Sequence, residues 1–298
     1  MKINMQFSKA VFLTLVLVQV IFACDKNNDV DPWPELYKNV SINQITDYNG
    51  GWEYHPKWSH DGEKISFARY NQSSGETTLY IWSQNDGNIT TIVTNMFGDF
   101  SSSWNPDDTK LAFDARDEND VSQIYIVDLD DGKVNKFTNG NSNSFRPDWS
   151  NDGENIVYVN GNSLYYRPIE SGNAIKLEGT EQGWNPSWNF HDSKILFSKN
   201  GQNEDLHTIN ADGTDLTQIA TGNSSGSENW ASWSPDGNSI VYQLFNSGVP
   251  RIVMENLLDN KTYLLTEQDD CRFPDWSPDG NSIVYAHDDN LWILTFNE

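Results

Sequence analysis

Short segments in which apolar and polar residues alternate recur along the chain, and each follows a tryptophan and a tight turn. In the first such unit, 64–70 (KISFARY) alternates with the period of a half-buried strand. The tryptophan recurs, 39 to 46 residues from one copy to the next, as Trp58, Trp104, Trp149, Trp188, Trp233 and Trp276. A fixed period of this length, with about four strands per unit, is typical of a β-propeller. The pattern therefore predicts an all-β fold with six blades.

Each unit is expected to contain four strands joined by short turns. In the first unit, one strand ends on Trp58, a second covers 64–70, a third covers 78–83 and a fourth covers 88–94. An Asp-Gly pair before the fourth strand tolerates the positive φ of a tight hairpin. The motif tryptophans hold the same place in every unit, so we expect them to pack in the core between blades.

The turn after the tryptophan reads Ser-Pro-Asp-Gly in the fifth and sixth units. Pro presets φ at the second turn position, and Gly accepts left-handed geometry where the turn closes. The second unit has Asp108 where Gly is expected, and the fourth unit, 189–192 (NFHD), has neither Pro nor Gly. We expect these two turns to be the least regular.

The last unit is expected to borrow a strand from the beginning of the chain. After Trp276 the pattern predicts two further strands, 282–287 and 291–296, and no fourth strand. The segment 41–46 (SINQIT) is similar to 215–220 (DLTQIA), a fourth strand of another unit. We therefore predict that this N-terminal strand closes the last blade and removes an exposed sheet edge. The predicted domains are a lipoprotein signal peptide (1–23), a flexible tether (24–39) and the propeller (40–298).

Composition narrows the range of partners. Hydrophobic residues make up 37% of the chain and aromatic residues 13%, so aromatic side chains carry much of the expected core. The formal net charge of −24 makes nucleic acid an unsuitable partner, because phosphate binding needs clustered Lys and Arg. Cationic ligands, metal ions and basic protein surfaces are compatible with this charge. The simpler interpretation is an acidic surface that only keeps an exported protein soluble.

The first 24 residues have the pattern of an export signal. Lys2 and Lys9 accompany an apolar stretch, 10–23, that is too short for a comfortable membrane span. The stretch ends IFAC at Cys24, which resembles the lipobox of bacterial lipoproteins, although Phe22 replaces the usual small residue. The resemblance implies lipidation of Cys24 and an exported protein on the outer membrane of a Gram-negative bacterium, facing the periplasm or the outside. An ordinary signal peptide is the alternative.

The pattern Trp-Ser-Pro-Asp-Gly-x-x-Ile-x-Tyr resembles the TolB-type propeller repeat over about 41–298. Similar repeats build the propellers of prolyl-oligopeptidase-like and tricorn-type peptidases and of oligogalacturonate lyases. The resemblance is specific for the fold and weak for the function. It implies a non-catalytic scaffold that binds a protein or ligand in the cell envelope. The alternative is a carbohydrate-active propeller, either glycan-binding or similar to oligogalacturonate lyase.

The residues just before each motif tryptophan are the candidate binding site, because the first strand of a propeller blade lines the central channel. Every unit has an aromatic residue there, and most have an acidic residue nearby. The predicted rim and channel residues are Trp52, Glu53, His55, Asp99, Phe100, Phe145, Arg146, Trp184, Glu228, Trp230, Asp270, Arg272 and Phe273. Such a collar could bind a sugar, a cation or a basic peptide. Alternatively, the aromatic residues wedge between blades and the acids are solvated.

Candidate catalytic chemistry is sparse. Of the five histidines, only His55 lies just ahead of a motif tryptophan, three residues before Trp58, and one histidine does not make a metal site. We predict no catalytic residue and no cofactor, with a divalent cation in the central channel left open. The expected partners are an envelope protein or a glycan, and the protein is expected to be a monomer that touches the membrane only through its lipid. Cys24 and Cys271 are the only cysteines, so no disulfide framework is expected.

Overall fold

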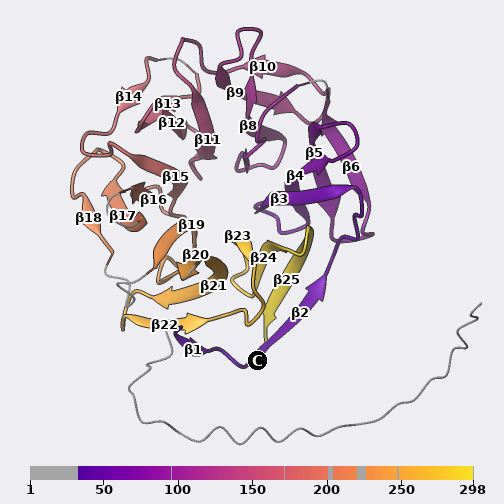
Figure 1. Cartoon of the computed structure of the whole chain (residues 1–298). Helices are drawn as coiled ribbons and strands as arrows, with labels where there is room; N and C mark the ends of the chain where they lie inside the picture. Colours follow the sequence, from indigo (N-terminus) through magenta and orange to yellow (C-terminus); the bar gives the residue numbers. More distant parts are fainter. Residues whose placement is uncertain are drawn as a thin grey trace, which may run out of the picture. The chain divides into compact units, whose positions relative to one another are not determined.

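The computed structural model describes residues 33–94, 96–170, 172–200, 204–219, 226–246 and 248–297. These residues form six sheets that stand around a common axis as the blades of a propeller, which confirms the predicted fold (Figure 1). The predicted signal peptide and Cys24 lie outside the described residues. Within the described ranges, no helix combines the length and the apolar character that a membrane span requires.

The blades follow one another in sequence, and consecutive strands within each blade pair antiparallel, with the first strand innermost. Blade 1 consists of β3 (Gly51–Trp58), β4 (Lys64–Asn71), β5 (Glu76–Ser83) and β6 (Ile89–Val93). Blade 2 consists of β7 (Ser102–Trp104), β8 (Lys110–Arg116), β9 (Ser122–Asp128) and β10 (Val134–Lys136). Blade 3 consists of β11 (Ser144–Trp149), β12 (Asn155–Asn160), β13 (Ser163–Pro168) and β14 (Ile175–Lys176).

The second half of the ring repeats this plan, with additions from the N-terminal segment. Blade 4 consists of β15 (Gly183–Trp188), β16 (Lys194–Asn200), β17 (Glu204–Asn210) and β18 (Thr217–Gln218). Blade 5 consists of β19 (Ser227–Trp233), β20 (Ser239–Asn246), β21 (Val249–Asn256) and β22 (Lys261–Leu264), joined by β1 (Glu35–Leu36). Blade 6 consists of β23 (Arg272–Trp276), β24 (Ser282–His287) and β25 (Asn290–Phe296), joined by β2 (Val40–Gln44).

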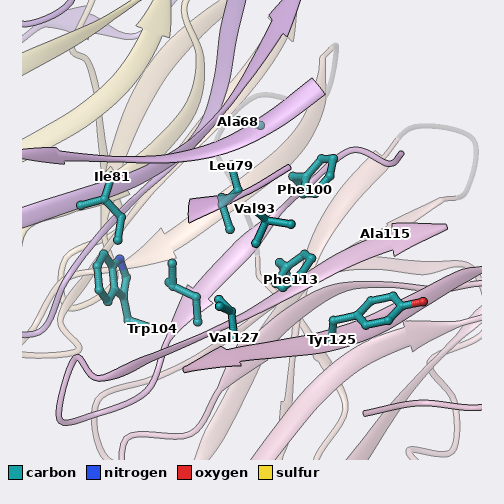
Figure 2. Packing of buried hydrophobic residues seen from close by; sticks show 11 residues of the cluster. Ala68, Leu79, Ile81, Val93, Phe100, Trp104, Phe113, Ala115, Tyr125 and Val127 are labelled. Atoms are coloured by element: carbon teal, nitrogen blue, oxygen red, sulfur yellow. The ribbon is translucent and has the colours of Figure 1, made fainter. Parts of the chain in front are cut away.

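The core lies between neighbouring blades. All six motif tryptophans are buried, each with at most 8% of its surface exposed, as predicted from their constant place in the repeat. Figure 2 shows one such cluster, in which Phe100 and Phe113 approach each other near Leu79 and Val93. Burial of rings and branched side chains from two blades removes apolar surface from water at each seam. The seams thereby fix the angle from one blade to the next.

The ring closes as the sequence predicted. Strand β2 pairs antiparallel with β25, from Val40 opposite Phe296 to Gln44 opposite Trp292. In Figure 1, the indigo β2 accordingly lies beside the yellow β25. Val40 and Ile42 pack against the core cluster that blades 5 and 6 share. The N-terminal strand therefore contributes both ladder hydrogen bonds and apolar burial to the last blade.

Part of the segment predicted as a tether is structured. Strand β1 pairs in parallel with β22, with Glu35 opposite Tyr263 and Leu36 opposite Leu264. The backbone N–H of Tyr37 donates to Leu264 O at 2.8 Å, and the Tyr37 ring lies edge-on to Tyr263. The described part of the tether, 33–39, thus runs along blade 5 before β2 joins blade 6. A short motif of two paired residues carries no periodicity by which the sequence could reveal it.

The expectation of two irregular turns is wrong. Asp108 and Asp192 adopt φ values of 57° and 52°, in the same left-handed region as Gly62 at 71°. Their N–H groups close the turn to the carbonyl three residues earlier at 3.0 Å, just as the glycines do. Asp tolerates this region better than most residues because its short side chain can form local hydrogen bonds. Each of these carboxylates also accepts hydrogen bonds from the turn of the preceding blade, such as His60 N and Asp61 N to Asp108.

Candidate functional site

Five of the six inner strands carry a β-bulge three residues before the motif tryptophan. The register of the ladder shifts there in β3, β11, β15, β19 and β23. The bulged residues all have φ between 52° and 57° and line one small axial cavity: His55, Arg146, Asn185, Trp230 and Phe273. Bulges re-aim side chains and are frequent beside functional sites. Here they turn five side chains from five blades toward the axis.

A short sequence signal marks these bulges. In four of the five strands the bulged residue is followed by proline: Pro56, Pro147, Pro186 and Pro274. Proline has no N–H, so it suits a position where the ladder is interrupted. These prolines also line the small axial cavity, together with Ala231 in β19. The x-Pro-x-Trp pattern would have identified Asn185 as an axial residue, which the sequence analysis missed.

The bulged side chains form a compact aromatic and cationic cluster. The His55 and Trp230 rings stack with their centroids 4.4 Å apart, and Phe273 lies edge-on to both, at 4.5 and 4.7 Å. The Arg146 guanidinium carbon lies 4.0 Å from the Trp230 ring centroid, and its Nη1 donates to Asn185 Oδ1 at 2.5 Å. This arrangement of a guanidinium over a ring is an attractive cation–π contact. The cluster narrows the axial channel.

A larger cavity of about 780 Å³, which we call the upper cavity, opens on one side of this cluster. Nine of the thirteen predicted residues line it: Trp52, Glu53, His55, Asp99, Arg146, Trp230, Asp270, Arg272 and Phe273. Residues that the sequence analysis missed also line it, among them Tyr54, Tyr70, His287, Asp288 and Asp289. The last two form the hairpin between β24 and β25, an Asp-Asp pair where Asn-Gly is the usual choice. This unusual Asp-Asp pair was the sequence feature by which the two cavity residues could have been identified.

Four predicted residues lie elsewhere. Phe100 is fully buried between blades 1 and 2, where it stacks on Phe113 (Figure 2). Phe145 and Trp184 stack on each other with centroids 5.2 Å apart and do not line the upper cavity. Glu228 is buried and also does not line it. The same position in the repeat therefore faces the cavity in some blades and a blade seam in others.

Burial and charge shape the ionisation of groups around the upper cavity. Burial raises the pKa of Glu53, against hydrogen bonds from Thr46 and Arg69 that lower it. The Arg69 Nε donates to Glu53 Oε1 at 2.8 Å. Burial and then the charge of Arg146 lower the pKa of His55 well below its ordinary value, so the ring is neutral at neutral pH. Burial and then the charge of Asp99 raise the pKa of Asp114 to about 7.

The other end of the axis is a polar ring formed by the residue directly before each motif tryptophan. These residues are Lys57, Ser103, Asp148, Ser187, Ser232 and Asp275, and with the six tryptophans they line a small cavity of about 80 Å³. The carboxylate of Asp275 accepts from Lys57 Nζ at 2.9 Å and from Trp58 N at 2.8 Å. Burial raises the pKa of Asp148 to about 6, although the charge of Lys57 lowers it. Because these bonds cross between blades, the ring joins the blades at the axis.

The described residues contain no group of three or more His, Cys, Asp or Glu side chains arranged to hold a metal ion. His55 and His287 both line the upper cavity, but among the described residues neither belongs to such a group. Catalytic and structural metal sites usually require three or four protein ligands. The residues described around the axis therefore do not fit a site of that kind.

Known proteins resemble this chain in both sequence and structure. The uncharacterized peptidase YuxL of Bacillus subtilis (strain 168) is 27% identical over 146 residues, which are 42% of this chain and 22% of the peptidase. TolB from Acinetobacter baumannii is 19% identical with a TM-score of 0.66, covering 76% of this chain and 57% of TolB. An oligogalacturonate lyase in complex with manganese is 14% identical with a TM-score of 0.60, covering 89% of this chain and 96% of the lyase.

These likenesses differ in what they establish. The two structural matches are below a quarter identity and show a shared fold. The chain spans about a fifth of the length of the peptidase and just over half of TolB. A family model described as the TolB beta propeller domain matches residues 37–224, which is more than half of the chain. The chain therefore belongs to the TolB β-propeller domain family.

Proposed function

We propose that this protein is a non-catalytic binding scaffold of the bacterial cell envelope, held at the outer membrane by a lipid on Cys24, which takes its partner at the upper cavity. The observation that carries the proposal is the cavity itself. It has a volume of about 780 Å³, aromatic walls and five carboxylates against two guanidinium groups. Pockets of this size with a few convergent polar groups are the usual sites of ligand recognition.

Several charged groups of the cavity are held in place by contacts with other side chains. Glu53 is paired with Arg69, and Arg272 Nε donates to Asp270 Oδ1 at 2.6 Å. Arg146 donates to Asn185 and stacks on Trp230. Groups fixed in this way present a rigid surface, which favours recognition because little side-chain entropy is lost on binding. This rigidity supports a binding role for the rim.

Site-specific cross-linking in intact cells tests the proposal. A photo-reactive amino acid in place of Trp52, which is 43% exposed and lines the cavity, should capture an envelope component. The same amino acid in place of Leu258, which is 74% exposed in the turn between β21 and β22, is the matched control. Capture at 52 and not at 258 supports the proposal. Equal capture at both positions, or none at 52, contradicts it.

Anchoring is tested separately. The Cys24→Ser variant should fail to incorporate a radiolabelled fatty acid and should move from the membrane to the soluble fraction of the envelope. A Cys271→Ser variant is the control, because Cys271 is buried in the propeller. Retention of Cys24→Ser in the membrane fraction would contradict the lipid anchor and leave the cavity proposal untouched.

A second candidate function is glycan binding, and one observation favours it. The exposed Trp52 ring stacks on Tyr70 with centroids 4.2 Å apart, which forms a flat aromatic platform at the cavity. Loss of glycan-array binding in Trp52→Ala, with binding retained in Trp184→Ala outside the cavity, would support this function. Cleavage of oligogalacturonate by the purified protein would overturn the non-catalytic proposal.

A further inference from the structure

We infer that the upper cavity takes the cationic side chain of an extended basic peptide, whose charge faces Asp99, Asp288 and Asp289. The inference deepens the proposed function and rests on it. It names the chemistry of the partner: a Lys ammonium or Arg guanidinium enters the cavity, and the adjoining residues of the peptide lie in a groove over blades 1 and 2. Four features of the site support this assignment.

The first feature is negative charge that no ion pair neutralises, although the charge of Asp99 also acts on Arg116. Asp99, Asp288 and Asp289 line the cavity and form no ion pair with any described residue, whereas Asp270 is paired with Arg272. Asp99 also lies near enough to Asp114 for its charge to raise the pKa of that buried carboxyl. Like charges this close are relieved when a cation binds between or beside them.

The second feature is the hairpin that presents two of these carboxylates. Asp288 and Asp289 have φ values of 50° and 63° in a two-residue turn between β24 and β25. Such a turn strongly prefers Asn-Gly, since both central residues need positive φ. The equivalent two-residue turn of blade 3, between β12 and β13, has Gly161 at its first position. The Asp-Asp pair therefore costs local stability while adding two negative charges at the mouth of the cavity.

The third feature is an unused hydrogen-bond acceptor. His55 lines the cavity, is only 7% exposed, and its Nδ1 has no hydrogen-bond partner among the described residues. Burial lowers the pKa of this ring, so the ring is neutral and one of its two nitrogens carries a lone pair. Ammonium and guanidinium groups are pure donors and match an acceptor of this kind.

The fourth feature is the wall of the cavity and its extension. The rings of Trp52, Tyr54, Trp230 and Phe273 line it, and aromatic faces attract desolvated cations. A second hollow of about 460 Å³ shares Thr77, Gly98 and Asp99 with the upper cavity. It continues toward blade 2 past Phe97, which is 63% exposed, to Arg116, Asp117 and Asp120. Asp120 is paired there with Arg116, and Asp117 with Lys136. This continuity favours a linear segment over a single small cation.

Titration with defined peptides tests the inference. The probes are acetylated, amidated pentalysine, the matching pentaglutamate and the polyamine spermine, measured by calorimetry against the full propeller at low and high salt. The variant is D288N/D289N, because Asn tolerates positive φ as Asp does and only the charge is lost. The matched control is D130N/D131N, which removes two charges from the turn between β9 and β10, away from the cavity.

We expect pentalysine to bind the wild type and the control alike, to bind D288N/D289N about tenfold more weakly or worse, and to weaken as salt rises. Pentaglutamate should not bind. The inference is overturned if pentalysine does not bind, if D288N/D289N binds it as tightly as the control does, or if spermine binds as tightly as the peptide. After any of these results, capture at position 52 in the cross-linking test would still support a binding function, with a partner of other chemistry.

Discussion

Two aspartates that stand in place of glycine bridge neighbouring blades. The Asp108 carboxylate accepts from His60 N and Asp61 N, both at 2.8 Å, and Asp192 accepts in the same way from Asn151 N and Asp152 N. Charge-assisted hydrogen bonds of this kind are among the stronger ones in proteins. At other seams, a proline of one turn instead approaches the glycine of the next, as Pro278 does at Gly62. A single residue thus decides how two turns meet.

The Asp108→Gly variant should lower the free energy of unfolding by about 1–3 kcal/mol, because two backbone donors lose their acceptor while the left-handed φ stays accessible. The control is Asp120→Gly, which removes an exposed aspartate with φ of 60° that pairs only with Arg116. Both are measured by denaturant unfolding. Equal stability of the two variants would show that the bonds across the seam contribute nothing.

Glu255 makes stability depend on pH. Burial raises its pKa to about 7, it is 1% exposed, and its Oε2 has no hydrogen-bond partner. The folded state therefore holds a proton that the unfolded state releases near the ordinary value of 4.5. Stability from this group is fully present below that value and is lost as pH rises through about 7.

The Glu255→Gln variant should accordingly be more stable than the wild type at pH 8, by about 2 kcal/mol, and nearly equal to it at pH 4.5. Urea unfolding at several pH values measures the difference. A difference that does not change between these pH values would contradict the assignment. Asp114, whose pKa is raised to about 7, should add a slope of the same sign in both proteins.

At the scale of single elements, the bulged inner strand is the unit that builds the axis. Its proline follows a residue with positive φ in four blades, and Ala231 holds the equivalent place after Trp230 in β19. The backbone there follows the same path, since Trp230 has a φ of 53° and the ladder shifts at the same point. The geometry is therefore already suited to proline in the one bulged strand that lacks it.

The Ala231→Pro variant should raise the free energy of unfolding by about 0.5–1 kcal/mol, because proline restricts the unfolded chain at a position whose folded geometry it can adopt. The converse variant, Pro186→Ala in β15, should lower it by a similar amount. Midpoints of guanidinium unfolding report both changes. Destabilisation by Ala231→Pro would mean that β19 bulges differently from the other strands.

At the scale of the whole propeller, the N-terminal segment is fastened at two places. Strand β2 completes blade 6, and the residues before it run along blade 5 through β1. The Tyr37 ring lies edge-on to Phe296, and Asn297 N donates to Asn39 O at 2.9 Å. Ring closure therefore joins the two ends of the propeller sequence, which are far apart along the chain.

Deleting 40–47 should lower the melting temperature by much more than a single substitution does. Strand β25 loses its whole ladder with β2, and blade 6 loses the burial of Val40 and Ile42. The matched control deletes only 33–38 and should melt between this variant and the wild type. Circular dichroism and dye binding follow the transition. A 40–47 deletion that melts no earlier than the control would contradict closure by β2.

The candidate site was predicted in part. His55, Trp230 and Phe273 were found because an aromatic or histidine side chain recurs before each motif tryptophan, and sequence spacing is enough to place them at the axis. Phe100 stands four residues before its motif tryptophan, where His55, Trp230 and Phe273 stand three before theirs. It lies in a seam, and the short inner strand β7 of blade 2 has no register shift. Whether a side chain faces the cavity depends on a bulge that moves it from one face of the strand to the other.

Strand period, turn chemistry and the repeat of tryptophan are local patterns, so the amino-acid sequence by itself determined six blades, their turns and the strand that closes the ring. The tertiary structure alone decided which residues meet at the axis, how Asp288 and Asp289 come to line the same cavity as His55 from another blade, and where β1 lies. Contacts between blades join residues that are far apart along the chain, as Asp108 and His60 are at 48 positions, and no local period encodes such pairs.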